Sequence, residues 1–435
     1  MQRFFSIAVW FVLFLSFRMF VFAQDDATLF AGAADRIEQH RKDDVRIKVL
    51  NADGNPVSDV EVHLEQNSHE FLFGANVFNW NRCRTEEENE SYKDRFAALL
   101  NYATLGFYWA SYEKERGKPN HDYTKQVAGW CKEHGIATKG HPLAWNHTDA
   151  PWHEGIDTDE LFRLQIERIE DCVQMMSGWV DRWDVVNEIT YFDTYHRTQL
   201  HTEMWRKVGK IEFTKECLIA ARKATPNAIL LVNDHATDEE YVKVLEQLVD
   251  ADGKKLYDEI GIQSHMSHME GVWSNTEIWE ICERFARFGV PLHFTEMTII
   301  SSPNTWEDTI GKGNEWLTTP DGEEKQKDDV LQVFTMLFSH PSVEAITWWD
   351  LSDQGSYLNA PSGFLRKDMS PKPVYNALME QIKTHWTTNV RLKTGENGIA
   401  STRAFRGAYT VRVGDTTTLY TVKKGAAGEI VITLN

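Results

Sequence analysis

The chain has 435 residues, which is enough for one large domain with an appendage or for two or three ordinary domains. Hydrophobic residues make up 42% of it and charged residues 26%, the composition of a soluble globular protein. The formal net charge of −19 disfavours phosphate backbones and anionic lipid, so nucleic acids and membrane surfaces are poor candidate partners, and a neutral substrate suits the chain better.

The N-terminal segment differs from the rest of the chain. A basic start at residues 1–3 precedes an uncharged run over 4–17, and Ala23 offers a small residue at a plausible cleavage point. This order is typical of a secretory signal peptide, so we expect residues 1–23 to be removed and the mature protein to be secreted or periplasmic. Arg18 interrupts the apolar stretch, and a retained membrane anchor is the alternative. No later segment is apolar enough to cross a bilayer.

Residues 24–69 follow as an N-terminal β flank. Two alternating patterns within Arg46–Glu65 surround the turn-forming run 51–56 and predict two strands. The flank is too small to bury a core of its own. It therefore needs a partner elsewhere in the chain.

Residues 70–385 alternate short apolar runs with amphipathic helical patterns. The predicted strands are Phe71–Val77, Tyr102–Phe107, Ala137–Ala144, Val180–Val186, Ile229–Val232, Ile260–Ser264, Pro291–Thr295 and Ala345–Trp349. The helical patterns include Asp159–Met176, Trp205–Lys223, Glu239–Val249 and Asp328–Phe338. Eight strands with intervening helices predict an α/β protein with a (β/α)8 TIM barrel. The alternative, an open doubly wound sheet, normally has a glycine-rich first turn, and Phe73–Asn76 lacks the second and third glycines.

Residues 386–435 form a C-terminal β flank that is rich in Thr, Val and Gly. Strands are predicted at 408–413, 418–422 and 429–434. We predict that the two flanks pair into one small β-module beside the barrel. Because aromatic residues are sparse there, capping of the barrel is the expected role, with sugar binding or tethering as alternatives.

The five cysteines are widely spaced and odd in number, without the pairing of a metal site: Cys83, Cys131, Cys172, Cys217 and Cys282. Most of them fall within predicted helices. Core thiols are therefore expected, rather than a disulfide framework.

Two apolar runs of the predicted barrel end in a glutamate. Trp183–Asn187 leads into Glu188, and His293–Thr295 leads into Glu296. Functional groups of such barrels lie at the C-terminal ends of strands, and the fourth and seventh strands are not neighbours, so the two carboxylates can face each other across the mouth. Cleavage of a glycosidic bond needs such a pair, one protonated and one ionised. Surface acids near helices are the alternative, which the cost of burying a charge disfavours.

Histidines and tryptophans fall near the same strand ends. His141 and His265 are placed to donate hydrogen bonds to a carboxylate or a sugar hydroxyl, whereas each alone also fits a satisfied core histidine. Sugar rings stack on aromatic faces, and core packing is the alternative for each tryptophan. The tryptophans near strand ends are Trp109, Trp145, Trp348 and Trp349. No two histidines share a helix face at metal-binding spacing, so no metal and no cofactor is predicted.

In order and spacing, several segments resemble glycoside hydrolase family 10, the endo-1,4-beta-xylanase family. They are Gly140–Trp145, Trp183–Glu188, Gly261–His265, Phe294–Glu296 and Trp349–Asp353. The resemblance covers roughly residues 70–385. It implies a (β/α)8 barrel and retaining hydrolysis of β-glycosidic bonds, with the two carboxyl groups ~5–5.5 Å apart.

The resemblance also implies a role for each matching residue. Glu188 corresponds to the general acid/base and Glu296 to the nucleophile. The other matches are Asn187 for the sugar 2-hydroxyl, His141, Gln263 and His265 for the nucleophile and the bound sugar, Trp145 and Trp349 for the aromatic walls, and Tyr357 at the place of a further tryptophan. The implied partner is a polysaccharide or oligosaccharide, with no indication of oligomeric state.

The chain departs from the family pattern beside the catalytic pair. Typical xylanases carry Glu-Asn-x-x-Lys-Trp after the second strand, where the Asn and Lys grip the sugar on the non-reducing side. Here Thr104–Trp109 keeps only the tryptophan, with Leu105 and Tyr108 in place of the gripping residues, and Asn146 stands where a histidine is common. We expect an endo-1,4-beta-xylanase-like enzyme. A β-glycosidase for a non-xylan polysaccharide, a non-catalytic carbohydrate-binding protein and a metal-dependent barrel hydrolase are the alternatives.

Overall fold

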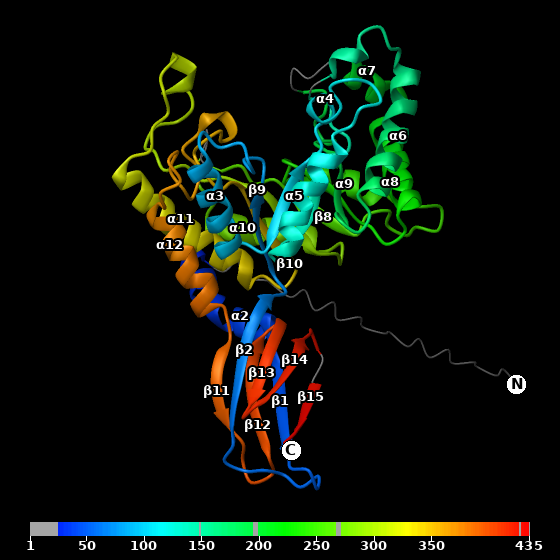
Figure 1. Cartoon of the computed structure of the whole chain (residues 1–435). Coiled ribbons are helices and arrows are strands. Elements are labelled where there is room, and N and C mark those ends of the chain that lie inside the picture. Colours follow the sequence, from blue (N-terminus) through cyan, green and yellow to red (C-terminus); the bar gives the residue numbers. More distant parts are fainter. Residues whose placement is uncertain (1–24, 148, 195–198, 267–270, 426–427, 435) are drawn as a thin grey trace, which may run out of the picture.

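The computed structural model describes residues 25–147, 149–194, 199–266, 271–425 and 428–434, so the predicted signal peptide lies outside the described residues. Within them, parallel strands close into a barrel in the order β10-β3-β4-β5-β6-β7-β8-β9. Helices follow the strands and surround the barrel, and a smaller β-module lies at one end of it (Figure 1). The predicted (β/α)8 barrel and its accompanying β-module are confirmed.

Each predicted barrel strand is present. The strands are β3 (Leu72–Asn76), β4 (Tyr102–Gly106), β5 (Ala137–His141), β6 (Arg182–Asn187), β7 (Ile229–Asp234), β8 (Glu259–Ile262), β9 (Leu292–Met297) and β10 (Val343–Asp350). The helices are α3 (Glu86–Leu99), α4 (Trp109–Tyr112), α5 (His121–Glu133), α6 (Thr158–Met175), α7 (Gln199–Val208), α8 (Lys210–Ala224), α9 (Glu239–Gln247), α10 (Asn275–Ala286), α11 (Pro320–Ser339) and α12 (Pro373–Glu380). Shorter turns of helix are η1 (Pro151–His153), η2 (Ile310–Lys312), η3 (Tyr357–Asn359) and η4 (Gln381–His385).

One helical pattern is interrupted. The sequence predicts a single helix over Trp205–Lys223, whereas α7 ends at Val208 and α8 begins at Lys210. Gly209 between them has a φ of +89°, a conformation that glycine alone adopts without strain. Because both helices bury residues at helical spacing, hydrophobic periodicity does not reveal the break.

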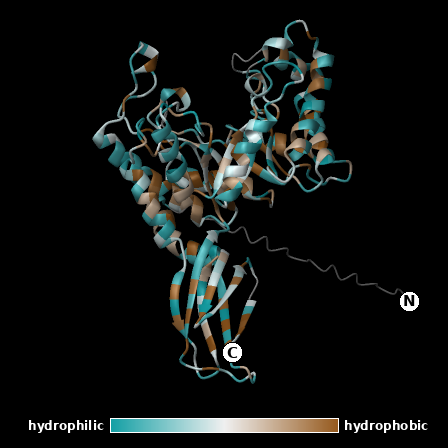
Figure 2. Ribbon diagram, in the orientation of Figure 1, coloured by the Kyte–Doolittle hydropathy of each residue, from teal (hydrophilic) through white to brown (hydrophobic). Residues whose placement is uncertain are grey.

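The β-module joins the two ends of the chain. Its strands are β1 (Lys42–Leu50), β2 (Glu61–His69), β11 (Asn389–Lys393), β12 (Ile399–Phe405), β13 (Gly407–Val413), β14 (Thr416–Val422) and β15 (Gly428–Thr433). They form one sheet in the order β12-β1-β15 and another in the order β11-β2-β13-β14. Hydrophobic and hydrophilic residues alternate along these strands (Figure 2), and the inward side chains, such as Val45, Leu64 and Tyr409, share one core. The strands β11 and β12 are not among those expected from the sequence.

Two helices precede the first strand of the module, where sequence analysis assigns only a β flank. They are α1 (Asp26–Ala31) and α2 (Ala33–Arg41), and both contact α11 of the barrel. Arg41 is buried, and its guanidinium donates to the carbonyl oxygens of Phe338, His340 and Val343 at 2.6–2.7 Å. Since β2 leads directly into β3, the module docks where the barrel strands begin. The barrel strands finish at the opposite end.

Two further expectations concern the described residues. All five cysteines are free thiols, and all but Cys83 are buried, which confirms core thiols rather than a disulfide framework. Among the described residues, no helix combines the length and the hydropathy that a bilayer crossing requires.

Candidate active site

The two glutamates lie at the end of the barrel where the strands finish. Glu188 follows directly after β6, and Glu296 is the penultimate residue of β9. Their residues are only 8% and 4% exposed. Glu188 has a φ of +60°, and Ser264 beyond β8 has a φ of +59°. Non-glycine residues persist in this strained conformation only where the surroundings hold them, and such positions cluster at functional sites.

A chain of side-chain amides connects the two carboxylates. Glu188 Oε1 accepts hydrogen bonds from Gln263 Nε2 at 3.1 Å and from Asn187 Nδ2 at 3.4 Å. Glu296 Oε1 accepts one from Asn233 Nδ2 at 2.7 Å. The same Asn233 amide donates to Asn187 Oδ1 at 2.8 Å, which closes the chain across β6, β7 and β9. The two carboxylates therefore face one common site.

Both predicted histidines lie beside Glu296. His265 Nε2 is 3.2 Å from Glu296 Oε2, and His141 Nε2 is 3.7 Å from Glu296 Oε1. Burial by itself would raise the pKa of Glu296, but His141 and His265 outweigh it and hold that pKa below its ordinary value. The surroundings thus favour an ionised carboxylate on Glu296.

A buried ion pair lies behind His141. Asp184 Oδ2 is 2.8 Å from His141 Nδ1 and 2.7 Å from Lys139 Nζ, and none of the three residues is more than 1% exposed. Burial would raise the pKa of Asp184, yet Lys139 and His141 lower it below its ordinary value. An ionised Asp184 accepts a hydrogen bond from Nδ1 of His141 and so directs Nε2 towards Glu296.

Aromatic rings form a wall around this centre. The ring of Trp349 lies 5.3 Å from that of His141 and 6.0 Å from that of His265. Tyr357 is 44% exposed and stacks on His265 at 4.9 Å. Trp145 lies 5.7 Å from Tyr108, whose ring is 5.4 Å from His141. The structure thus brings together every residue that sequence analysis assigned to the site.

Three other residues near strand ends are buried in the packing around this centre. Trp348 is fully buried and donates from Nε1 to the carbonyl of Ser362 at 2.9 Å. Trp109 is buried against His153, with ring centroids 4.6 Å apart. Asn146 is also buried and donates to the carbonyl of Phe192 at 2.7 Å. These side chains belong to the packing around the site.

The model of glycosyl hydrolase family 10 matches residues 64–381, which is most of the chain and contains the whole centre just described. The chain belongs to glycosyl hydrolase family 10. The match also agrees with the barrel, because the described strands β3 to β10 all lie within it.

Individual relatives support the same assignment. Endo-1,4-beta-xylanase 2 of Arabidopsis thaliana is 22% identical over 90% of this chain, and endo-1,4-beta-xylanase B of Thermotoga neapolitana is 26% identical over 67% of it. The chain spans only 34% and 83% of their respective lengths. Xylanase 10B from Thermotoga petrophila, crystallised with xylobiose, superimposes with a TM-score of 0.59 at 22% identity, over 72% of this chain and 95% of that chain. This likeness shows a shared fold.

Two polar residues of this family 10 site, Asn233 and Asp350, are not among those expected from the sequence. Asn233 lies near the end of β7, and its side-chain amide donates to Asn187 and to Glu296. Asp350 is the last residue of β10. Burial raises the pKa of Asp350 to about 6, although the backbone N–H of Tyr357 and the amide of Asn76 donate to its carboxylate. A polar residue that directly follows an apolar strand is a usable signal for both positions.

Gly261 in β8 makes room for Asn233, its partner in the strand pairing. A Cβ on Gly261 would overlap Oδ1 of the Asn233 side chain and contact its Cα. We expect Gly261→Ala to displace the Asn233 amide and to lower kcat/KM by about a hundredfold, because a small misplacement of supporting groups has a large effect on rate. Gly271→Ala is the matched control, since no atom of the described residues lies within 4 Å of its added Cβ. Equal activity of the two variants on a common substrate would contradict the assigned role of Asn233.

One cluster near the site has residues that commonly bind metals. Within the described chain, ligand atoms of Asp149, His153 and His201 all lie within 4.8 Å of one another. Burial, followed by His201, lowers the pKa of His153 to about 4, so its ring is neutral. Nδ1 of His153 accepts from the backbone N–H of Ala150 at 3.2 Å, which leaves the proton on Nε2. Nε2 of His153 is buried without a hydrogen-bond partner among the described residues, whereas Nδ1 of His201 pairs with Asp149, and the ring of His153 packs against Trp109.

Proposed function

We propose that the protein is an exported retaining β-glycoside hydrolase that acts on a polysaccharide, with endo-1,4-beta-xylanase-like activity. The observation that carries the proposal is the amide chain that joins Glu188 to Glu296. Two buried carboxylates are costly to keep side by side without a function. Membership of family 10 and the xylanase names of its relatives support the substrate class.

In the first proposed step, Glu296 attacks the anomeric carbon while Glu188 gives its proton to the leaving glycosidic oxygen. A covalent glycosyl ester forms on Glu296. In the second step Glu188 takes a proton from water, which attacks the same carbon and releases Glu296. His141 and His265 stabilise the ionised nucleophile, and Asn187 is positioned to bond the sugar 2-hydroxyl beside Glu188.

The grip on the non-reducing side differs from that implied by the xylanase pattern. Leu105 is 2% exposed and offers no hydrogen bond, and Tyr108 presents an aromatic ring between His141 and Trp145. Loss of an amide and an ammonium removes donors that would discriminate between sugar hydroxyls. A β-glycosidase for a non-xylan polysaccharide is therefore the second candidate function, favoured by these two replacements.

A non-catalytic carbohydrate-binding protein is the remaining candidate. It shares the altered grip, but it gives no reason for the lowered pKa of Glu296 or for the strained backbone at Glu188. Covalent labelling of the nucleophile distinguishes a retaining hydrolase from a non-catalytic carbohydrate-binding protein. A mechanism-based glycosyl fluoride inactivator is expected to add one sugar mass to Glu296 of the full chain.

The stereochemistry of the product tests the proposed mechanism. Proton NMR of the first product from a β-linked oligosaccharide is expected to show the β-anomer, because two inversions at one carbon give net retention. A polysaccharide panel that includes xylan would supply the substrate. An α-anomer as the first product, or an inactivator mass on another residue, would overturn the double displacement.

A further inference from the structure

A pocket of about 570 Å³ lies directly beside the catalytic centre, at the place of the altered sugar grip. Leu105 and Tyr108 line it together with Phe78 and the segment that joins α4 to α5. Tyr108 also borders the catalytic pair, since burial and then Glu296 and Glu188 raise its pKa. A volume of this size is in the range of small-ligand sites, which is ~300–1,000 Å³.

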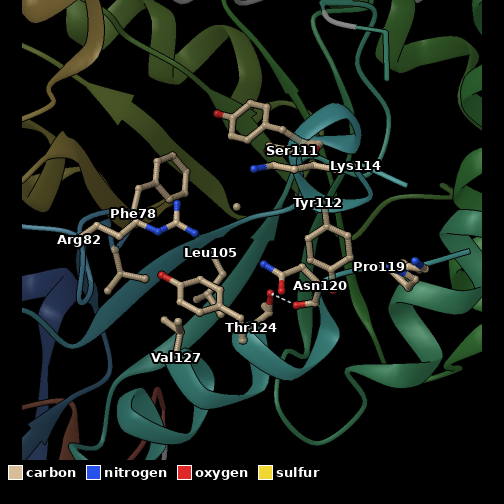
Figure 3. Close-up of a pocket in the computed structure, with 15 residues that line it drawn as sticks. Phe78, Arg82, Leu105, Ser111, Tyr112, Lys114, Pro119, Asn120, Thr124 and Val127 are labelled. Carbon is tan, nitrogen blue, oxygen red and sulfur yellow. Dashed lines mark hydrogen bonds between the residues drawn. The ribbon is translucent and has the colours of Figure 1, made fainter. Parts of the chain in front are cut away.

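The charge of this pocket is opposite to that of the whole chain. Among its 15 lining residues, three are basic, Arg82, Lys114 and Lys118, and none is acidic (Figure 3). The formal net charge of the chain is −19. In a protein with this excess of acids, an acid-free lining with three cations is a local feature that attracts anions.

The two acids of the segment that joins α4 to α5, Glu113 and Glu115, are not among the residues that line the pocket. Glu113 accepts hydrogen bonds from Trp109 Nε1 at 2.9 Å and from the backbone N–H of Gly117 at 2.6 Å. Glu115 pairs with Lys118 at 2.5 Å, so one of the three cations is already neutralised. Two cations are left to act on a ligand.

Arg82 and Lys114 are those two cations. Neither makes an ion pair with any residue in the described part of the chain, and both are exposed. Arg82 lies over the ring of Tyr123 at 4.7 Å, which fixes its guanidinium at the pocket wall. Figure 3 shows the Arg82 guanidinium and the Lys114 amine extending towards each other from different sides of the pocket.

We propose that this pocket is a subsite for an acidic sugar unit of the polysaccharide, with Arg82 and Lys114 contacting its anionic group. The inference rests on the proposed function and names a substrate class for the same site. A guanidinium pairs with a carboxylate or a sulfate through two parallel hydrogen bonds, whereas an ammonium acts as a point charge. The aromatic rings of Phe78, Tyr108 and Tyr123 supply apolar faces for the sugar ring.

Matched pairs of substrates test this subsite on the full chain. One pair is a glucuronic acid-substituted xylan and its carboxyl-reduced form, and the other is a sulfated β-glycan and its desulfated form. We expect kcat/KM to be about tenfold higher for the acidic member of one pair, which identifies the source of the anion. In Arg82→Gln/Lys114→Gln this ratio should fall to about one. Lys254→Gln, an exposed lysine outside the pocket, should keep the wild-type ratio.

A binding measurement separates failure of the subsite from failure of the proposed hydrolysis. Calorimetry with Glu296→Ala is expected to give tighter binding of an acidic oligosaccharide than of its neutralised form, and the Arg82→Gln/Lys114→Gln changes should abolish that difference. If neither pair shows a preference in this assay, or if the preference survives both changes, the subsite is refuted. Lack of turnover with a preserved binding preference would refute the hydrolysis and leave the subsite standing.

Discussion

Replacement of Glu296 by alanine is expected to lower kcat/KM by at least about 10⁴-fold and to leave the fold intact, because it removes the group that forms the covalent bond. Glu188→Ala should have a large effect too, and the two losses should not add, since both residues serve the same steps. Circular dichroism and thermal unfolding check the fold. Glu133→Ala, which removes an exposed acid on α5, is the control and should keep wild-type activity.

Rescue by azide distinguishes the two roles. In Glu296→Ala the small anion can occupy the vacated space and attack in place of the carboxylate, which yields the α-azide of a β-linked substrate. In Glu188→Ala the glycosyl ester still forms with an activated leaving group, and azide then gives the β-azide. The opposite assignment of products would exchange the two roles. Full activity of both variants would remove the catalytic interpretation of the site.

The architecture and the catalytic pair were accessible to sequence reasoning because each depends on a local pattern. A buried parallel strand appears as a short apolar run, and Glu188 and Glu296 each stand directly at the end of such a run. The docking of both flanks into one module also follows, since neither can bury a core alone. Elements that bury little are harder to find: β11 has no buried residue and α1 buries only Leu29.

The supporting residues were not accessible in the same way. Asn233 matters because it bonds Glu296 and Asn187, which are 63 and 46 residues away in the chain. Asp184 lies inside the recognised stretch before Glu188, but its pairing with Lys139 needs the register of β5 against β6. The basic pocket is likewise a product of folding, since Arg82 and Lys114 come from different loops. The Asn233 bonds, the Asp184–Lys139 pair and the basic pocket all depend on contacts between segments that are distant in the sequence. The hydrophobic periodicity of a single segment carries no information on such contacts.

Asp184→Asn is expected to destabilise the protein by about 3–5 kcal/mol, because it leaves the Lys139 ammonium buried without its counter-charge. It should also replace the charged acceptor beside Nδ1 of His141 with a neutral amide, which can donate as well as accept, and so weaken the orientation of His141 and lower kcat, while binding of substrate changes less. Chemical denaturation measures the free energy of unfolding. The native pKa of Asp184 is lowered, so the wild-type advantage should be present above the unfolded-state pKa and be lost as pH falls through the native pKa.

A variant that lacks both charges tests whether the loss of stability in Asp184→Asn comes from the unpaired Lys139 ammonium. In Lys139→Met/Asp184→Leu neither charge of this buried pair is left, so the double variant should be more stable than Asp184→Asn, although His141 loses its charged partner in both. Its activity should stay low, because Nε2 of His141 is no longer directed at Glu296. A double variant that is both less stable than the single one and fully active would show that Asp184 neither compensates Lys139 nor orients His141. Asp184 therefore affects both stability and catalysis, because it compensates the buried charge of Lys139 and orients His141, which lies beside Glu296.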